Sequence, residues 1–173
     1  PLIAADYGFL SDRKESREES ASRGLTSILV VRDKGSGATL AMAVPHKGEE
    51  PVWVPQRCAR WVDSLGYQRV TLKTDQEPAI RAWARAVARY READTVPETS
   101  PVGDSQSNGV AEQVVGGVKK MISILKHALS TNIKSDIEPR HAVMTLVGRI
   151  CGRPHHPPQG QARWAHGLRS HTR

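Results

Sequence analysis

The chain of 173 residues has little cysteine, few aromatic residues and no long apolar run. Its two cysteines, Cys58 and Cys151, are too few for a disulfide framework and suit a reducing compartment. No apolar stretch approaches the roughly 20 residues that a membrane-spanning helix needs, and the pattern of a signal peptide is missing. We therefore expect one domain that acts without a membrane, since the 38 % of apolar residues is enough for a core.

The positive net charge is concentrated at one end of the chain. Of the formal charge of +7, residues 146–173 supply +5, because they contain five arginines and neither lysine nor an acidic residue. Residues 1–145 are close to neutral, so overall basicity is weak evidence that this part binds nucleic acid. The chain starts at Pro1 and enters a strand pattern at once, which we interpret as a piece of something longer.

Hydrophobic periodicity predicts an alternation of strands and helices. The expected strands are Leu2–Phe9, Leu25–Val31, Ala38–Val44, Arg69–Asp75 and a short extended piece within 94–109. The expected helices are 55–65, Glu77–Arg91 and a long one that Asn108 would cap and that would end near Leu129. The mixed-charge segment Ser11–Arg23 is predicted to be a solvated loop. This β–β–β–α–β–α–β–α order predicts an α/β fold, a mixed sheet with helices on its faces.

Three carboxylates occupy positions that structure alone does not explain. Asp6 interrupts an apolar strand, Asp75 closes an alternating strand, and Glu112 lies in the first turns of the long helix. Catalytic groups commonly emerge at strand ends and helix starts. Mg²⁺ prefers carboxylate oxygens and retains several other ligands as water or phosphate. We expect these three residues to converge and to bind Mg²⁺ or Mn²⁺, as two ions that clamp a phosphoryl displacement.

The long helix carries a polar stripe that starts at Glu112. At 100° per residue, one side of the helix collects Glu112, Gly116, Lys119, Ser123, Lys126 and Ser130. A carboxylate at one end of this stripe and lysines further along it suit a surface for metal and phosphate. The alternative interpretation is an ordinary solvated helix face.

Three motifs in order, ADYGF (5–9), LKTDQEPAI (72–80) and SPVGDSQSNGVAEQ (100–113), resemble the integrase catalytic core of retroviruses and LTR retrotransposons. The 36 residues between Asp75 and Glu112 and the Asn-Gly pair at 108–109 are similar to the family's Asp-Asp-Glu pattern. The resemblance extends over about residues 1–145. Gln113 and Gly116 depart from it, because basic residues are common at these positions in the family.

This resemblance implies an RNase H-like fold with a five-stranded mixed sheet, and it implies that Asp6, Asp75 and Glu112 are the catalytic, metal-binding triad. It also implies that Lys119 contacts DNA, and that Ser107 and Asn108 lie in an active-site loop beside the DNA end. From the polar stripe of the helix we expect Lys126 to contact DNA as well. The implied activity is DNA integration by a Mg²⁺-dependent polynucleotidyl transferase, which processes DNA 3′ ends and joins them to target DNA. Such an enzyme would act as a homo-oligomer and, when it works on host DNA, in the nucleus.

Two alternatives remain open from the sequence. The chain would be a non-catalytic, nucleic-acid-binding relic of an integrase domain, or an RNase H-like nuclease that only hydrolyses DNA. Beyond Thr145 the resemblance stops. Shifting the reading frame by one base can restore family-like segments, so we expect residues 146–173 to be a frameshifted, disordered or non-native tail, in a copy whose activity is open.

Overall fold

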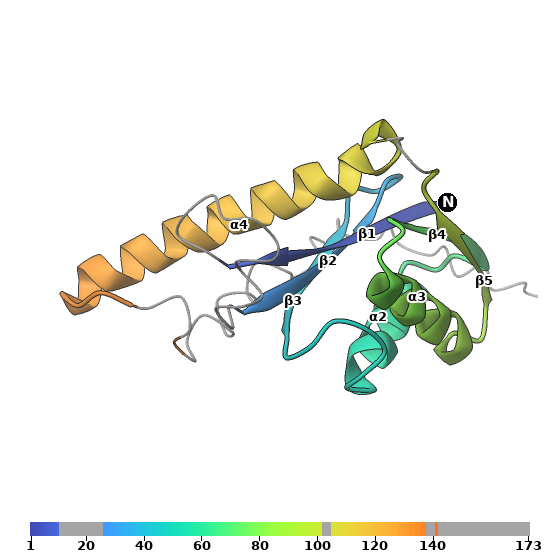
Figure 1. Cartoon of the computed structure of the whole chain (residues 1–173), viewed down its shortest axis with the longest axis horizontal. Helices are drawn as coiled ribbons and strands as arrows, with labels where there is room; N and C mark the ends of the chain where they lie inside the picture. Colours follow the sequence, from blue (N-terminus) through green and yellow to red (C-terminus); the bar gives the residue numbers. More distant parts are fainter. Residues whose placement is uncertain (11–25, 102–104, 138–140, 142–173) are drawn as a thin grey trace, which may run out of the picture.

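A computed structural model describes residues 1–10, 26–101, 105–137 and 141, and for 105–108 it describes the backbone only. Five strands form one sheet, and three helices of the described part lie along its faces (Figure 1). The strands are β1 (Leu2–Phe9), β2 (Ser27–Asp33), β3 (Thr39–Val44), β4 (Arg69–Thr74) and β5 (Asp94–Thr99). The helices are α2 (Trp53–Ser64), α3 (Pro78–Tyr90) and α4 (Ser105–Ile133). None of these helices combines the length and the apolar content of a membrane span.

The sheet is mixed, in the strand order β3–β2–β1–β4–β5. Strands β1, β2 and β3 are antiparallel neighbours, whereas β4 runs parallel to β1 and β5 runs parallel to β4. The edge strand β5 tolerates Pro97 because it pairs on one side only, with β4. The predicted α/β class with a five-stranded mixed sheet flanked by helices is confirmed, and the architecture is consistent with an RNase H-like fold.

Each face of the sheet has its own apolar core. On one face, the odd-numbered β1 residues Ile3, Ala5 and Tyr7 pack with α2 and α3, and Trp83 of α3 is completely buried there. On the other face, α4 packs through Val115, Val118 and Ile122 onto strand residues that include Ile28 and Val30. Because side chains alternate along a strand, Ala4, Asp6 and Gly8 of β1 belong to the α4 face.

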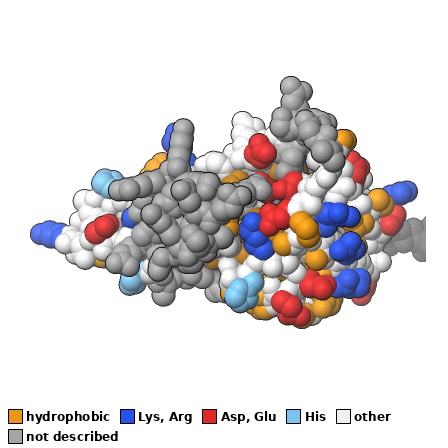
Figure 2. Space-filling view, viewed as in Figure 1, with side chains coloured by type: hydrophobic (Ala, Val, Ile, Leu, Met, Phe, Trp, Pro, Cys, Tyr) orange, Lys and Arg blue, Asp and Glu red, His pale blue; other side chains and the backbone are white. Residues whose placement is uncertain are grey.

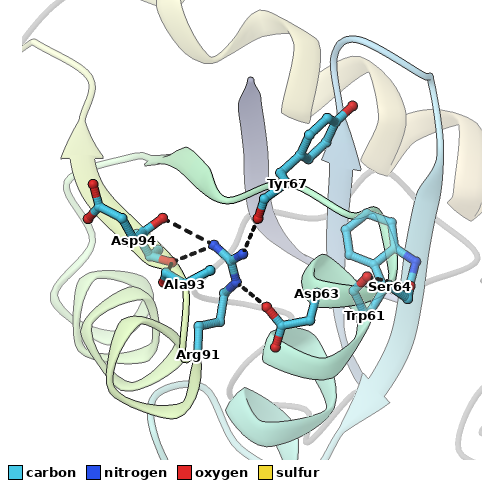
Figure 3. A network of polar contacts seen from close by, with 8 residues as sticks. Trp61, Asp63, Ser64, Tyr67, Arg91, Ala93 and Asp94 are labelled. Carbon is cyan, nitrogen blue, oxygen red and sulfur yellow. Dashed lines mark hydrogen bonds and ion pairs between the residues drawn. The ribbon is translucent and has the colours of Figure 1, made fainter.

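Arg91 ties α2, α3 and β5 together at the edge of the fold (Figure 3). Its side chain is fully buried, and Nε binds Asp63 Oδ1 at 2.7 Å. The other guanidinium nitrogens donate to Tyr67 O at 2.9 Å, to Thr95 Oγ1 at 2.6 Å and to Asp94 O at 3.3 Å. A buried guanidinium is tolerated because these oxygens satisfy its N–H groups.

Element boundaries differ from the sequence-based expectation mainly at α4. The helix begins at Ser105, so the expectation that Asn108 caps it is wrong, and Asn108 lies in its first turn. It ends at Ile133, beyond Leu129, where Lys134 adopts a left-handed conformation with φ of 53°. A left-handed residue stops helix propagation, and nothing in residues 130–133 breaks the helix earlier. The predicted loop Ser11–Arg23 and the tail 146–173 lie outside the described residues.

Candidate active site

Asp6 lies in the middle of the central strand with only 2 % of its surface exposed. Its Oδ1 accepts a hydrogen bond of 2.7 Å from the backbone N–H of Tyr7. Burial of a carboxylate is costly, and a β-strand interior provides no structural need for one. The position is therefore a candidate for function, and strand alternation places it on the sheet face that α4 covers.

Asp75 directly follows β4, which is the parallel neighbour of the strand that carries Asp6. The parallel register pairs Ile3 with Leu72 and Ala4 with Lys73. Asp6 and Asp75 each lie two residues beyond the last of these pairs. Because parallel neighbours advance together and lie about 4.8 Å apart, the register brings Asp6 close to the end of β4, which Asp75 follows. Alternation gives Asp6 the α4 face.

Glu112 lies one helical turn before the part of α4 that packs over β1. A Cβ on Gly8 of β1 would meet Val115 Cγ1 at 2.7 Å and Lys119 Cε at 3.0 Å, so this part of α4 lies directly over Gly8. Helix α4 and strand β1 run in the same overall direction (Figure 1). One helical turn back from Val115, about 5 Å, leads to Glu112, and two residues back from Gly8, about 6.6 Å, lead to Asp6. The exposed Glu112 thus lies one turn N-terminal to the helix segment over Gly8, and it does not form with Asp6 and Asp75 a group close enough to hold a metal ion.

The turn that carries Asp75 is fixed from several sides. Asp75 Oδ1 accepts the backbone N–H of Glu77 at 3.0 Å. Gln76 Nε2 donates to Ser100 O at 2.9 Å, and the backbone N–H of Ser100 donates to Thr74 O at 2.9 Å. These bonds connect the ends of β4 and β5 and hold the turn that carries the carboxylate.

Lys47 bridges the same turn to β1. Its Nζ lies 2.8 Å and 3.1 Å from the two carboxylate oxygens of Glu77. It also lies 5.5 Å from the ring centre of Tyr7 and 5.0 Å from that of Phe9, which gives a cation–π contact with each ring. Sequence reasoning missed this pair because 30 residues separate Lys47 from Glu77 and no local pattern joins them.

Tyr7, next to Asp6, is a hydrogen-bonding anchor and not an acid or base at neutral pH. Its hydroxyl accepts the backbone N–H of Gly48 at 3.0 Å. Burial raises the pKa of Tyr7 to about 12, against a smaller lowering by the bond from Gly48. The phenol therefore stays protonated. Through the bond from Gly48, it connects the loop that carries Lys47 to the central strand.

The predicted DNA contacts have different environments. Lys119 is half-buried beside Gly8, on the same side of α4 as Glu112. Lys126 is mostly buried, with 13 % of its side chain exposed, and its Nζ lies 3.9 Å from Asp136 Oδ1. The expectation that Ser107 and Asn108 lie in a loop is wrong, because their backbones belong to the first turn of α4; their side chains lie outside the described part. The predicted contacts therefore all lie on one helix.

The carboxylates of Asp6, Asp75 and Glu112 have the right donor atoms for a divalent cation, but they are not arranged as a closed metal site. Carboxylate oxygens are the ligands that Mg²⁺ and Mn²⁺ prefer. Among the described side chains, however, no group of three or more His, Cys, Asp or Glu residues lies close enough to hold a metal ion. The case for a metal therefore depends on the donor chemistry and on the register of Asp6 and Asp75. Figure 2 shows acidic side chains, with basic ones beside them, between the start of α4 and the α2–α3 pair.

A hollow of about 660 Å³ lies on the opposite flank of α4. Its described lining comes from the ends of β2 and β3 and from the first half of α4: Arg32, Lys34, Thr39, Val110, Gln113, Val114, Gly117, Val118 and Met121. None of the three carboxylates is among these residues. The hollow and the surface that carries Asp6, Asp75 and Glu112 are therefore separate, with α4 between them.

Comparisons with known proteins agree with the fold. No family model and no curated protein matches the sequence. Among solved structures, the chain is similar to a chain in the cryo-EM structure of the simian T-cell lymphotropic virus intasome in complex with PP2A regulatory subunit B56 gamma. The similarity has a TM-score of 0.56 at 13 % identity and covers 99 % of this chain. It covers 60 % of that chain, so the present sequence spans less than two thirds of its length. At this identity the likeness concerns the fold alone.

Proposed function

We propose that this chain is an integrase-type catalytic core that transfers DNA strands with Mg²⁺ or Mn²⁺. The observation that supports the proposal is the register of β1 and β4, in which the buried Asp6 lies close to the end of β4 and the fixed Asp75 follows that end. The order and spacing of the three carboxylate motifs and the similarity to a retroviral intasome chain support it. DNA ends and target DNA are the proposed substrates, a homo-oligomer the proposed assembly and the nucleus the proposed compartment.

In this proposal Asp6, Asp75 and Glu112 would hold the cations, which stabilise charge on the attacking and leaving oxygens of a phosphodiester. The chain's own contribution is positioning. The central strand fixes Asp6, and the Lys47–Glu77 bridge and the Gln76–Ser100 bond fix the turn of Asp75. Glu112 is delivered by the helix that packs over Gly8. Lys119, on the same helix side, would bind a DNA phosphate near these carboxylates.

The direct test measures joining of a labelled DNA oligonucleotide to a second DNA in Mg²⁺ or Mn²⁺. Asp75→Asn and Glu112→Gln keep the size of each side chain and remove its charge, so both should abolish joining while the melting temperature stays near that of the wild type. Glu92→Gln, at an exposed residue after α3, is the matched control and should retain activity. Full joining activity in either carboxylate variant would refute the assignment.

The two alternatives give different outcomes in the same assay. A nuclease of this fold would cut the DNA in a manner that requires Asp75 but would yield no joined product. A non-catalytic relic would bind the oligonucleotide and neither cut nor join it, and Asp75→Asn would then leave its behaviour unchanged.

A further inference from the structure

The hollow between α4 and the β2–β3 end has a chemistry that the proposed site does not use. Four of its described lining residues carry N–H or O–H donors, namely Arg32, Lys34, Thr39 and Gln113, and none of the described lining residues is acidic. Its volume of about 660 Å³ is in the range of ligand sites in general. The described lining therefore favours an anionic occupant.

Arg32 is held in place for such an occupant. Strand alternation gives it the α4 face, together with Val30 and Ile28 of the same strand. Its Nη1 donates to Thr39 Oγ1 at 3.0 Å, which orients the half-buried guanidinium across the hydrogen-bonded pair of β2 and β3. A planar guanidinium is well suited to bind phosphate oxygens, and the exposed Lys34 adds a second positive charge two residues later.

The wall that α4 contributes is apolar and open. Val110, Val114 and Met121 line it, and Met121 is 53 % exposed. Gly117 lies between them, and a Cβ built there would have no neighbour within 4 Å. Apolar surface opposite a cationic rim matches a nucleic-acid strand, whose phosphates are charged and whose sugars and bases present apolar faces.

We propose that this hollow is a second nucleic-acid site, in which Arg32 and Lys34 bind phosphates of a strand that lies along the β3 side of α4. The inference rests on the proposed function, since it assigns the hollow to the same nucleic acid. Gln113 of the hollow adjoins Glu112 in the sequence, and the first turns of α4 separate the hollow from the surface of the proposed site. A strand held there would lie on one flank of the helix while the reacting phosphodiester lies on the other.

The test measures binding of a fluorescein-labelled single-stranded DNA 20-mer to the full chain by anisotropy at several salt concentrations. In the double variant Arg32→Gln/Lys34→Gln, the negative slope of the logarithm of the association constant against log salt should become shallower by about 1.4. Each lost phosphate contact contributes about 0.7 for single strands. Arg81→Gln/Arg85→Gln on the exposed side of α3 removes the same charge and should change the slope by less than half as much.

A second variant fills the hollow without altering its charge. Gly117→Leu places a side chain in open space and raises helix propensity, so the melting temperature should not fall while DNA affinity drops at least fivefold. Ala128→Leu adds a leucine at an exposed position of the same helix, outside the described lining, and should leave affinity unchanged. Equal affinities for these two variants, or equal slopes for the two double variants, would overturn the inference.

The same measurements distinguish failure of the proposed catalytic function from failure of this second nucleic-acid site. A wild-type chain that neither cuts nor joins DNA, but whose affinity falls in Gly117→Leu, would retain the nucleic-acid site and lose the catalytic proposal. A chain that joins DNA through Asp75, and in which Gly117→Leu binds as Ala128→Leu does, would retain the catalytic proposal and lose this site. An acidic 12-residue peptide that binds the wild type more tightly than the 20-mer, and loses affinity in Gly117→Leu, would assign the hollow to a protein partner instead.

Discussion

Gly8 is a point of close contact between the central strand and α4, and Gly8→Ala should destabilise the fold. The added Cβ would lie 2.7 Å from Val115 Cγ1 and 3.0 Å from Lys119 Cε. Carbon atoms prefer a separation of about 3.5–4.0 Å, so the Val115 methyl must withdraw by roughly 1 Å. Val115 is buried, and a β-branched side chain in a helix has one strongly preferred rotamer. The helix itself must therefore shift, whereas the end of Lys119 can move.

The magnitude follows from two opposing effects. Overpacking a core by one methyl group costs about 1–3 kcal/mol, and replacing glycine in a strand recovers about 0.5–1 kcal/mol of backbone entropy. With each effect at the middle of its range, the net loss in the free energy of unfolding is about 1.2 kcal/mol. For a chain of this size, 1 kcal/mol corresponds to roughly 2–4 °C, so the melting temperature should fall by about 2–5 °C.

The assay is urea unfolding followed by circular dichroism, with two comparisons. Gly117→Ala should stabilise the chain by about 0.5–1 kcal/mol, because its Cβ meets nothing within 4 Å and alanine favours a helix. Val115→Ala should cost less in the Gly8→Ala background than in the wild type, because it removes the colliding methyl group. DNA joining should also decline in Gly8→Ala, because the shifted helix carries Glu112. A Gly8→Ala variant that is as stable as the wild type would show that the close packing argument is wrong.

The remaining predictions concern two polar clusters. Arg91→Met should lower the free energy of unfolding by about 1–3 kcal/mol in urea titrations, because the carbonyl oxygens of Tyr67 and Asp94 lose their donor, while the exposed Asp63 can be solvated. Arg89→Met, which breaks an ion pair whose side chains are 62 % and 50 % exposed, should cost less than about 1 kcal/mol, and equal losses would contradict the burial argument. Burial disfavours the charge of Asp33, but hydrogen bonds from Ser36, Tyr67 and Gly35 outweigh it and lower the pKa of this carboxyl. Its stabilising contribution is therefore complete above the unfolded pKa of about 3.9 and is lost as the pH falls through the lower folded pKa. Asp33→Asn should flatten the loss of stability below pH 4, and a denaturation midpoint with the same acid dependence as the wild type would argue against this.

Patterns within single segments were sufficient for the element order and the sheet class. The alternation of Arg69–Asp75 predicted β4, the apolar stripe of residues 80–87 predicted α3, and both lie close to the expected bounds. Such patterns are local, because a strand or helix with one buried face records that face in its own sequence. The start of α4 was misplaced because Asn108 is a good cap by residue type, whereas the turn before it extends the helix to Ser105.

The sequence also selected Asp6, Asp75 and Glu112 as residues of interest from their types and positions, and their roles remain a proposal. What only the tertiary structure decided is which distant residues meet. The register of β1 and β4 placed Asp6 close to the end of β4, which Asp75 follows, and the contact at Gly8 fixed which part of α4 lies over β1. The Lys47–Glu77 bridge and the hollow that contains Arg32 had no local signature. Contacts between segments far apart in the chain depend on how several elements pack at once, and a periodic pattern within one element does not specify that packing.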